Sequence, residues 1–244
     1  MPQPRLISFV IPAWNEETVL GATLEAFNVA RQQLAETSEV IVVDDSSTDR
    51  TADIARQHGA RVVAVRQRQI SSTRNAGARE AQGDMLLFID ADTIVTSEAV
   101  RAAVEAVRTG AVGGGCAIRY TGQIPAYLRL FIPFEVWLAR QMRIAFGCFL
   151  FCTRAAFDAA GGFDTTLFAT EEVTLSLALR RQGRFVCLRE CVSTSGRKLR
   201  THSTWEWAVQ MYRITLARKR YIRDRSAMGV WYGDRRPDPE LTKP

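Results

Sequence analysis

The first hundred residues alternate short apolar runs with stretches of helical periodicity. Apolar runs of four or five residues predict buried strands, and apolar side chains recurring every three or four residues predict amphipathic helices. The predicted strands span residues 7–11, 40–43, 61–65 and 85–89. The predicted helices between them span residues 16–34, 47–58 and 72–81. Strands that are apolar on both faces and joined by helices pair in parallel, so this half predicts a doubly wound α/β sheet.

The second half is less regular and more aromatic. Further strands are predicted over residues 112–120 and 147–153, and helices over residues 173–181 and 205–223. The last segment, residues 229–244, contains glycine and several prolines and is predicted to be a loose tail. We therefore expect one α/β domain over the preceding residues 1–228, with a mainly parallel central sheet and C-terminal amphipathic helices.

Polar loops follow the four predicted strands of the first half, and three of these loops are acidic. The acidic loops span residues 14–17, 44–47 and 90–92. In parallel α/β sheets, ligands bind outside the carboxyl ends of the strands. If the strands merely ended in solvent, there would be no reason for three of the four loops to be acidic. We therefore expect these carboxylates to converge on one crevice.

Asp90 and Asp92 form an Asp-x-Asp sequence directly after an apolar run. Two carboxylates at this spacing suit Mg²⁺ or Mn²⁺, which take oxygen ligands and often share them with substrate phosphates. Such a cation would clamp a diphosphate and stabilise it as a leaving group. Because Asp-x-Asp also occurs in ordinary surface loops, its position at the end of a buried strand is what makes it informative.

The sequence disfavours several other kinds of site. The phosphate-binding pattern GxxxxGK[ST] is absent, and GxGxxG is absent after the first strand. The two histidines, His58 and His202, stand in no nucleophile motif, which argues against a triad hydrolase. What remains is a nucleotide-sized crevice lined by carboxylates and a few arginines.

The five cysteines are predicted to be reduced thiols, and a zinc site is the less favoured alternative. They are Cys116, Cys148, Cys152, Cys187 and Cys191. Cys148 and Cys152 flank an apolar strand, whose alternation is expected to place both thiols on one buried face.

Charge and hydropathy bear on partners and location. The formal charge is +6, and the basic residues Arg213, Arg218, Lys219, Arg220, Arg223 and Arg225 crowd the C-terminal part. This charge favours an anionic partner: nucleic acid, anionic lipid or a phosphorylated substrate. No apolar run is long enough for a transmembrane helix, and the N-terminal run turns polar too soon for a signal peptide, so a cytoplasmic protein is expected.

Several motifs, in order, resemble those of the family 2 glycosyltransferases. They are IPAWNEE at residues 11–17, VDDSSTD at 43–49, RNAG at 74–77, FIDAD at 88–92, GGFD at 161–164, and Glu171-Glu172 with Leu175. The resemblance implies a GT-A fold and an inverting transfer from a nucleoside-diphosphate sugar to an acceptor hydroxyl, assisted by Mg²⁺ or Mn²⁺. It further implies that residues 1–95 bind the nucleotide sugar and residues 96–228 the acceptor.

The resemblance also assigns roles on the donor side. Pro12, Ala13, Glu16 and Asp45 would hold the nucleoside, with Asp45 at the base and Glu16 at the ribose.

Further motif positions would serve the rest of the donor. Arg74 would lie near the diphosphate, Asp92 would be the first metal ligand, and Asp90 would serve the ribose or sugar and share the metal. Trp14 departs from the family pattern, where tyrosine is usual, and Thr174 stands where a second acidic residue is common.

Glu171 or Glu172 would be the general base that activates the acceptor hydroxyl. An inverting transfer needs a carboxylate opposite the leaving group and within hydrogen-bond reach of the nucleophile. Family position favours Glu172, although the usual residue there is aspartate. The alternative is that one or both merely favour the helix dipole, with Thr170 as the helix cap.

Three segments outside these motifs suggest hypotheses. Residues 125–143 carry an apolar, aromatic pattern with Arg129, Arg140 and Arg143 on one helical stripe. Together with the basic helix 205–225, this segment could meet a membrane surface and admit a lipid-linked acceptor, and core packing is the alternative. The small-residue loop at 194–198 could close over the diphosphate through Arg197, or be an ordinary basic loop.

Two rivals come from other classes of protein. One is a nucleotide-sugar-binding protein without transferase activity, which the intact acidic pair and Asp-x-Asp disfavour. The other is a nucleic-acid-binding protein, suggested by the basic C-terminus, and the absence of a recognised nucleic-acid motif argues against it.

Overall fold

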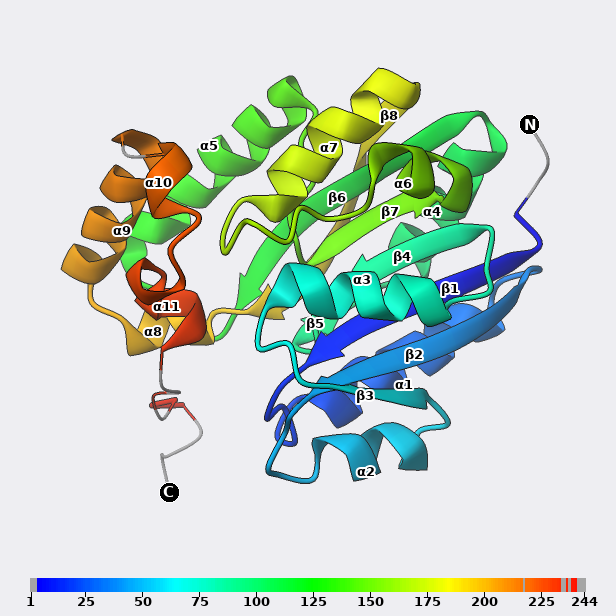
Figure 1. Cartoon of the computed structure of the whole chain (residues 1–244), viewed down its shortest axis with the longest axis horizontal. Helices are drawn as coiled ribbons and strands as arrows, with labels where there is room; N and C mark the ends of the chain where they lie inside the picture. Colours follow the sequence, from blue (N-terminus) through cyan, green and yellow to red (C-terminus); the bar gives the residue numbers. More distant parts are fainter. Residues whose placement is uncertain (1–3, 217, 234–235, 237, 241–244) are drawn as a thin grey trace.

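The computed structural model describes residues 4–216, 218–233, 236 and 238–240, with the backbone alone for residues 127, 216, 218 and 219. Within them, one eight-stranded sheet runs through the molecule and carries helices on both faces (Figure 1). The strands are β1 (Leu6–Ala13), β2 (Thr37–Asp45), β3 (Arg61–Val65), β4 (Met85–Ile89), β5 (Thr93–Ile94), β6 (Ala111–Thr121), β7 (Phe149–Thr153) and β8 (Arg184–Ser195).

The sheet is mainly parallel, as predicted. Its strand order is β3-β2-β1-β4-β7-β6-β8-β5. Parallel pairs join β1 to β2, β1 to β4, β2 to β3 and β6 to β8. The strand β7 is antiparallel to both β4 and β6, and the short β5 is antiparallel to β8. The carboxyl ends of β1, β2, β3 and β4 therefore meet at one edge of the sheet, where the acidic loops lie.

The helices of the described residues vary widely in length. They are α1 (Leu20–Gln32), α2 (Thr51–Gln57), α3 (Ile70–Glu80), α4 (Ser97–Arg108), α5 (Ala126–Met142), α6 (Arg154–Ala160), α7 (Glu171–Gln182), α8 (Arg197–Thr201), α9 (Thr204–Leu216), α10 (Arg218–Tyr221) and α11 (Gly229–Tyr232). Figure 1 shows α3, α6 and α7 on the near face of the sheet, and α1 and α4 behind it.

Strand alternation divides the core into two layers. In β1, Phe9 and its odd-numbered neighbours pack in the layer of α1 and α4, whereas Val10 packs in the layer of α3, α6 and α7. Gly77 permits the close approach of α3 to the sheet, because a Cβ there would collide with Val10 and Val43. The acidic loops are thus anchored on strands that are buried on both faces.

A third, smaller cluster ties the C-terminal helices to the loop before α7. Its buried members are Leu167, Ala169, Ile222 and Met228. The Phe168 N–H donates to the Ile222 carbonyl at 2.7 Å. The C-terminal part of the chain is therefore packed against the segment that leads into the acidic pair.

The structure corrects several predicted elements. The helix α4 and the long strand β8 were not predicted at all. The predicted helix 205–223 is two helices, α9 and α10, with residue 217 outside the described part. The basic residues of this C-terminal part include Arg218 and Lys219, whose side chains also lie outside the described part.

The predicted loose tail is packed over much of its described length. Residues 229–232 form α11, and Asp238 is buried, with its carboxylate accepting hydrogen bonds from Arg200 at 3.0 and 2.6 Å. Residues 234–235, 237 and 241–244 lie outside the described residues. The domain boundary at residue 228 stays a prediction.

The cysteines are free thiols among the described residues, and three of the five are buried. The prediction that Cys148 and Cys152 share one face is wrong. Cys148 precedes β7 and packs in the layer of α1 and α4, whereas Cys152 packs in the opposite layer. Strand alternation does not extend to Cys148, because it lies outside the strand.

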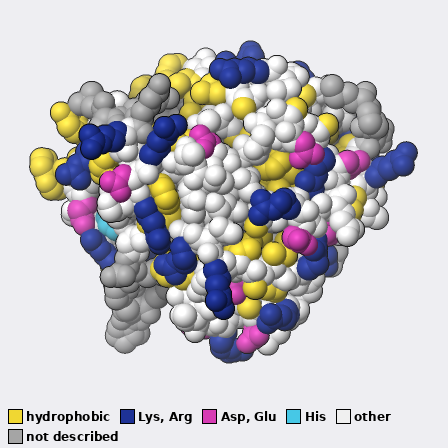
Figure 2. All heavy atoms as spheres, viewed as in Figure 1, with side chains coloured by type: hydrophobic (Ala, Val, Ile, Leu, Met, Phe, Trp, Pro, Cys, Tyr) yellow, Lys and Arg dark blue, Asp and Glu magenta, His cyan; other side chains and the backbone are white. Residues whose placement is uncertain are grey.

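The helix α5 presents its large apolar side chains to solvent, which contradicts core packing for them. Leu130 is 84% exposed, and Phe131, Phe134 and Trp137 are each at least half exposed. Figure 2 shows hydrophobic surface over α5 and at the edge formed by α9, with basic side chains between them. Among the described residues, no helix combines the length and the apolar character needed to cross a bilayer.

Candidate functional site

The loops after β1 and β2 are joined by hydrogen bonds between residues far apart in the sequence. The Asn15 N–H donates to Ser47 Oγ at 2.9 Å, and the Thr48 N–H donates to Asn15 Oδ1 at 2.7 Å. The Glu16 N–H donates to Thr51 Oγ1 at 2.8 Å. These contacts hold the two acidic loops as one unit and fix the backbone of Glu16 at the sheet edge.

Asp45 is buried at the end of β2, and its carboxylate organises the loop that leads into α3. Its Oδ1 accepts from the Gln67 N–H at 2.8 Å. Its Oδ2 accepts from Thr73 Oγ1 at 2.7 Å and from the Gln69 N–H at 3.3 Å. A carboxylate with several internal donors is held in one orientation, which suits a recognition role.

Asp90 and Asp92 follow β4 on either side of the buried Ala91. Asp90 Oδ1 accepts from Arg74 Nη2 at 2.7 Å, whereas Asp92 Oδ1 accepts a longer bond, 3.4 Å, from Thr194 Oγ1. Burial, together with the charges of Glu16 and Asp90, raises the pKa of Asp92 to about 6. The nearby positive charges do not fully offset this, so Asp92 is the carboxylate of the pair better placed to gain from a bound cation.

Arg74 joins the end of β4 to the start of α7. Its side chain is almost completely buried, and Nη1 donates to Glu171 Oε1 at 3.0 Å. Its Nη2 donates to Asp90 and to the Gly147 carbonyl at 2.8 Å. Burial alone would lower the pKa of Arg74, but the charges of Asp90 and Glu171 outweigh it and the pKa is raised. A permanent positive charge therefore connects the Asp-x-Asp to the acidic pair.

Glu171 and Glu172 begin α7 and have different surroundings. Glu171 is buried and paired with Arg74, whereas Glu172 is half-buried. Burial and the charge of Glu171 raise the pKa of Glu172. The prediction of Thr170 as a side-chain cap is wrong: its φ is 63° and its side chain makes no capping hydrogen bond. The two acids themselves occupy the first turn, where the helix dipole favours negative charge.

Asn75 fixes the loop that precedes the acidic pair, a role that sequence reasoning missed. Its Nδ2 donates to the Phe163 carbonyl at 2.8 Å, and its Oδ1 accepts from the Phe163 N–H at 3.0 Å. Gly162 adopts a φ of 73°, and a Cβ there would lie 2.9 Å from Asn75 Oδ1. The motifs RNAG and GGFD therefore make direct contact, which a search for paired motifs could have suggested.

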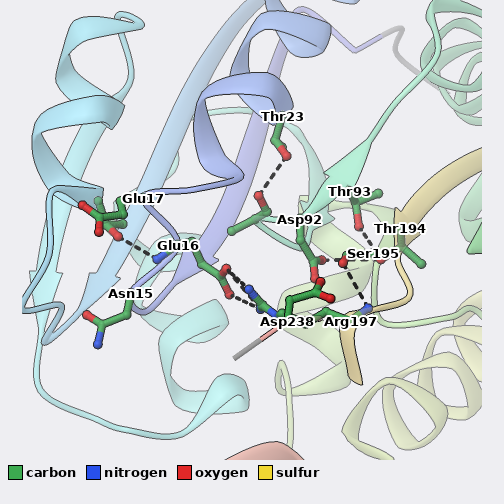
Figure 3. A network of polar contacts seen from close by, with 12 residues as sticks. Asn15, Glu16, Glu17, Thr23, Asp92, Thr93, Thr194, Ser195, Arg197 and Asp238 are labelled. Carbon is green, nitrogen blue, oxygen red and sulfur yellow. Dashed lines mark hydrogen bonds and ion pairs between the residues drawn. The ribbon is translucent and has the colours of Figure 1, made fainter. Parts of the chain in front are cut away.

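Glu16 and Arg197 form an ion pair across the site, although 181 residues separate them (Figure 3). The Arg197 guanidinium donates to both carboxylate oxygens at 3.2 to 3.3 Å. The structure corrects the predicted loop at 194–198: Thr194 and Ser195 end β8, and Arg197 begins α8. The pair brings two predicted donor-binding residues together.

A cavity of about 180 Å³ opens at this edge of the sheet. The predicted residues in its lining are Pro12, Ala13, Glu16, Asp45, Asp90, Asp92 and Arg197. Arg74, Glu171 and Glu172 are not among the lining residues, but they are linked to the cavity through Asp90. The structure thus brings the predicted site residues to one edge in two adjoining groups.

The part of the chain that carries most of the site matches a known protein family. The family model described as "Glycosyl transferase family 2" matches residues 8–160, which is more than half of the chain. The chain belongs to glycosyl transferase family 2. The matched range contains all of the motifs that carry the resemblance up to the end of α6, and the acidic pair follows it.

Curated relatives of this family-2 chain match over part of its length. The undecaprenyl-phosphate 4-deoxy-4-formamido-L-arabinose transferase of Serratia proteamaculans is 40% identical over 93 residues, or 35% of this chain and 28% of that protein. The poly(ribitol-phosphate) beta-glucosyltransferase of Bacillus spizizenii is 36% identical over 101 residues, or 38% of this chain and 16% of that protein. The matched stretch thus spans less than a third of either relative's length.

Solved structures extend the likeness to most of the chain. The mannosyltransferase PcManGT from Pyrobaculum calidifontis, in complex with GDP-Man and Mn²⁺, has a TM-score of 0.66 and 19% identity, covering 91% of this chain and 63% of that one. Glucosyl-3-phosphoglycerate synthase from Mycobacterium tuberculosis, with Mn²⁺ and UDP, has a TM-score of 0.60 and 21% identity, covering 87% and 78%. The fold of this family-2 chain is therefore the GT-A type of these glycosyltransferases.

Trp14 is stacked beneath a guanidinium that sequence reasoning missed. The Arg68 Cζ lies 3.5 Å from the centroid of a Trp14 ring, and both residues line the cavity. Arg68 adopts a φ of 47°. The substitution of tryptophan for the family's usual tyrosine was visible in the sequence, whereas its cationic partner, 54 positions later, had no local signal.

The donor set at Asp92 fits a hard cation that shares its ligands with a substrate. The described residues contain no group of three or more His, Cys, Asp and Glu side chains arranged to hold a metal ion. Mg²⁺ in nucleotide enzymes takes one or two carboxylates and completes its coordination with water and phosphate oxygens. Asp92, with its raised pKa, and Asp90 suit that pattern.

Proposed function

We propose that this protein transfers a sugar from a nucleoside-diphosphate sugar to an acceptor hydroxyl, with inversion at the sugar. The observation that carries the proposal is the network Asp92, Asp90, Arg74, Glu171 and Glu172. Arg74 connects Asp90, in the cavity lining, to Glu171, which Glu172 follows at the start of α7, in a chain of family 2. Its relatives are named as sugar transferases.

The donor would occupy the cavity at the carboxyl edge of the sheet. Asp45 and Trp14 would receive the base, and Pro12, Ala13 and Glu16 the rest of the nucleoside. Arg197 pairs with Glu16 in the structure, so donor binding would redirect this arginine toward the diphosphate. A positive charge next to developing negative charge stabilises it most in a site that excludes water.

A divalent metal, Mg²⁺ or Mn²⁺, would be held by Asp92 with help from Asp90. When bound, it would supply Lewis-acid stabilisation to the diphosphate. Arg74 fixes the orientation of Asp90, because its guanidinium donates to Asp90 Oδ1 at 2.7 Å. The Mn²⁺ complexes of two similar structures support a metal of this kind.

Glu172 is the better candidate for the general base, and Glu171 for a positioning residue. Glu171 is committed to Arg74, whereas Glu172 has a raised pKa, caused by burial and by the charge of Glu171. A general base works best when its pKa lies nearer the operating pH than that of an ordinary carboxylate. Glu172 would accept the proton of the acceptor hydroxyl as that oxygen attacks the sugar.

A lipid-linked acceptor fits the exposed apolar face of α5. Several relatives are named undecaprenyl-phosphate transferases, and such a substrate is presented at a membrane surface. The aromatic side chains of α5 and the exposed Trp205 and Tyr212 of α9 suit the interfacial region of a bilayer. The protein would then act on the cytoplasmic side as a peripheral protein.

Product analysis tests the transferase proposal. The wild-type protein is incubated with UDP- and GDP-sugars, Mn²⁺ and a panel of soluble hydroxyl acceptors and lipid-linked acceptors, polyprenyl phosphate included, and products are identified by mass spectrometry. We expect one glycosylated product, and we expect Glu172→Gln to lower its rate by about 10² to 10⁴ while nucleotide binding is retained. Glu190→Gln, on β8 and outside the cavity lining, is the control. Nucleotide binding without product formation over the whole panel would favour a binding protein instead.

A further inference from the structure

The C-terminal segment forms one wall of the cavity, although its composition predicts a loose tail. Val230, Trp231, Tyr232, Gly233 and Arg236 all belong to the cavity lining. The same cavity is lined by predicted site residues that lie between positions 12 and 92, and by Arg197. The cavity is therefore incomplete without the last part of the chain.

Specific contacts hold this wall in place. The Tyr232 ring packs edge-on against Phe168 at 5.5 Å, and the Trp231 ring packs edge-on against Trp207 at 5.7 Å. The Ile70 N–H donates to the Tyr232 hydroxyl at 3.4 Å. Met228, just before α11, is fully buried. The wall thus rests on the start of α3, the loop before α7, and α9.

Two further ion pairs fasten the chain beyond α11. Arg236 donates to both carboxylate oxygens of Glu206, at 3.1 and 2.6 Å. Arg200 and Asp238 form a second two-bond pair, with both side chains largely buried. A pair that is buried and geometrically complete resists separation, because breaking it would leave an uncompensated charge. The segment is consequently fixed on both sides of the aromatic residues.

Tyr232 joins the wall to the elements that carry Arg74 and the acidic pair. Its hydroxyl meets the first residue of α3, the helix that carries Arg74, and its ring meets Phe168, three residues before Glu171. The pKa of Tyr232 is raised by burial and by the negative charge of Glu171. Tyr232 therefore lines the cavity while resting on the start of α3 and on the loop before the acidic pair.

We propose that Trp231 and Tyr232 form the subsite for the transferred sugar and determine which sugar the protein accepts. The inference rests on the proposed transferase function. Binding sites for small molecules combine aromatic walls with a few placed polar groups, and here the polar groups lie on the sheet edge and the aromatic wall on the C-terminal segment. In the proposed function, residues outside this segment would hold the nucleoside and diphosphate, so we expect the wall to act on the sugar.

Paired binding measurements test the proposal. Calorimetry with Mn²⁺ compares UDP with UDP-glucose and GDP with GDP-mannose, in the wild-type protein and in Trp231→Ala, Tyr232→Ala and Tyr232→Phe. We expect the two alanine variants to lose about five-fold in affinity for the sugar nucleotide and to keep their affinity for the free nucleoside diphosphate. Tyr232→Phe keeps the ring and should bind both ligands as the wild type does.

Trp205→Ala is the matched control, because this tryptophan is 76% exposed on α9 and lies outside the cavity lining. It should change neither affinity, and circular dichroism should report the same fold for all variants. An equal loss of both affinities would show that the wall is merely structural, and unchanged affinity for the sugar nucleotide would show that it does not touch the sugar. Either result overturns the inference alone, whereas a wild-type protein that binds none of the four ligands overturns the proposed function as well.

Discussion

Arg74 is the side chain through which the Asp-x-Asp and the acidic pair are joined. It is 1% exposed, and it reaches two carboxylates and one carbonyl from three separate elements. The sequence predicted its presence at the site from the RNAG motif. The sequence did not predict its partner Glu171, because the 97 positions between them leave no periodic signal.

Replacing Arg74 should destabilise the fold strongly. Arg74→Met leaves Asp90 and Glu171 without their shared cation, at an expected cost of about 3–5 kcal/mol in the free energy of unfolding. Urea denaturation measures the change. Arg56→Met is the control, since its ion pair with Asp53 is exposed and should contribute less than about 1 kcal/mol. Equal effects of the two substitutions would contradict the structural role of Arg74.

The raised pKa of Asp92 predicts how stability depends on pH. A carboxyl group whose pKa is about 6 in the folded protein and 3.8 in the reference state binds more protons when folded. Its ionisation therefore costs folding free energy progressively as pH rises from about 4 to about 6, and the full cost remains above that range. We expect Asp92→Asn to raise the melting temperature of the metal-free protein at pH 8 and to leave it unchanged at pH 3.5.

Mn²⁺ provides the internal check on this pH effect. Added metal should raise the melting temperature of the wild-type protein at pH 8, because it offsets the repulsion among Asp92, Asp90 and Glu16. The same addition should have little effect on Asp92→Asn. If metal-free Asp92→Asn and the metal-free wild type melt at the same temperature at pH 8, the ionisation of Asp92 does not destabilise the fold.

Among the secondary-structure elements, strands with continuous apolar runs were predicted well, and elements with interrupted patterns were missed. The strands β3 and β4 begin and end where the sequence placed them. In β4, continuous burial on both faces leaves a clear signal. The edge strand β3 is half-buried or exposed at every position, and its valines supply the signal instead. The strand β8 was missed, because Arg184, Arg189 and Glu190 interrupt its apolar pattern and much of it is only half-buried. The helix α4 did have a signal, in Thr96 as its cap and in its regularly spaced valines and alanines.

The helix α5 is the element whose sequence pattern was most ambiguous. An apolar stripe predicts burial, but it cannot say whether protein or lipid covers the stripe. Here Leu130, Phe131, Phe134 and Trp137 face solvent, and Phe134 stacks on Trp137 at 5.7 Å. The exposed stripe, bordered by arginines, fits an anionic lipid surface.

Lipid binding by α5 can be measured by flotation with vesicles. We expect the protein to float with vesicles containing phosphatidylglycerol, to float less with phosphatidylcholine alone, and to be released by high salt. Phe134→Glu with Trp137→Glu should abolish flotation. Val29→Glu, at an exposed apolar position on α1, should not. If the wild type does not float but forms a dimer that these α5 substitutions disrupt, the apolar stripe contacts a second copy of the chain instead.

At the scale of the whole molecule, the site is assembled from contacts that no local pattern encodes. The sequence predicted that the acidic loops converge, since parallel strands bring their carboxyl ends to one edge. It did not predict the Glu16–Arg197 pair, the Trp14–Arg68 stack or the aromatic wall of α11. Each depends on the C-terminal segment or a loop returning to that edge, and long-range closure of this kind has no periodic signature.

The central claim is that this edge binds a nucleoside diphosphate through a metal held by Asp92. Titration calorimetry of UDP and GDP, with and without Mn²⁺, in the wild-type protein and in Asp92→Ala, tests it most directly. We expect the wild type to bind one of these nucleotides, more strongly with Mn²⁺, and Asp92→Ala to fold normally and to lose the metal-dependent part of the binding. Metal-dependent binding that is unchanged in Asp92→Ala, or no nucleotide binding by the wild type, would contradict it.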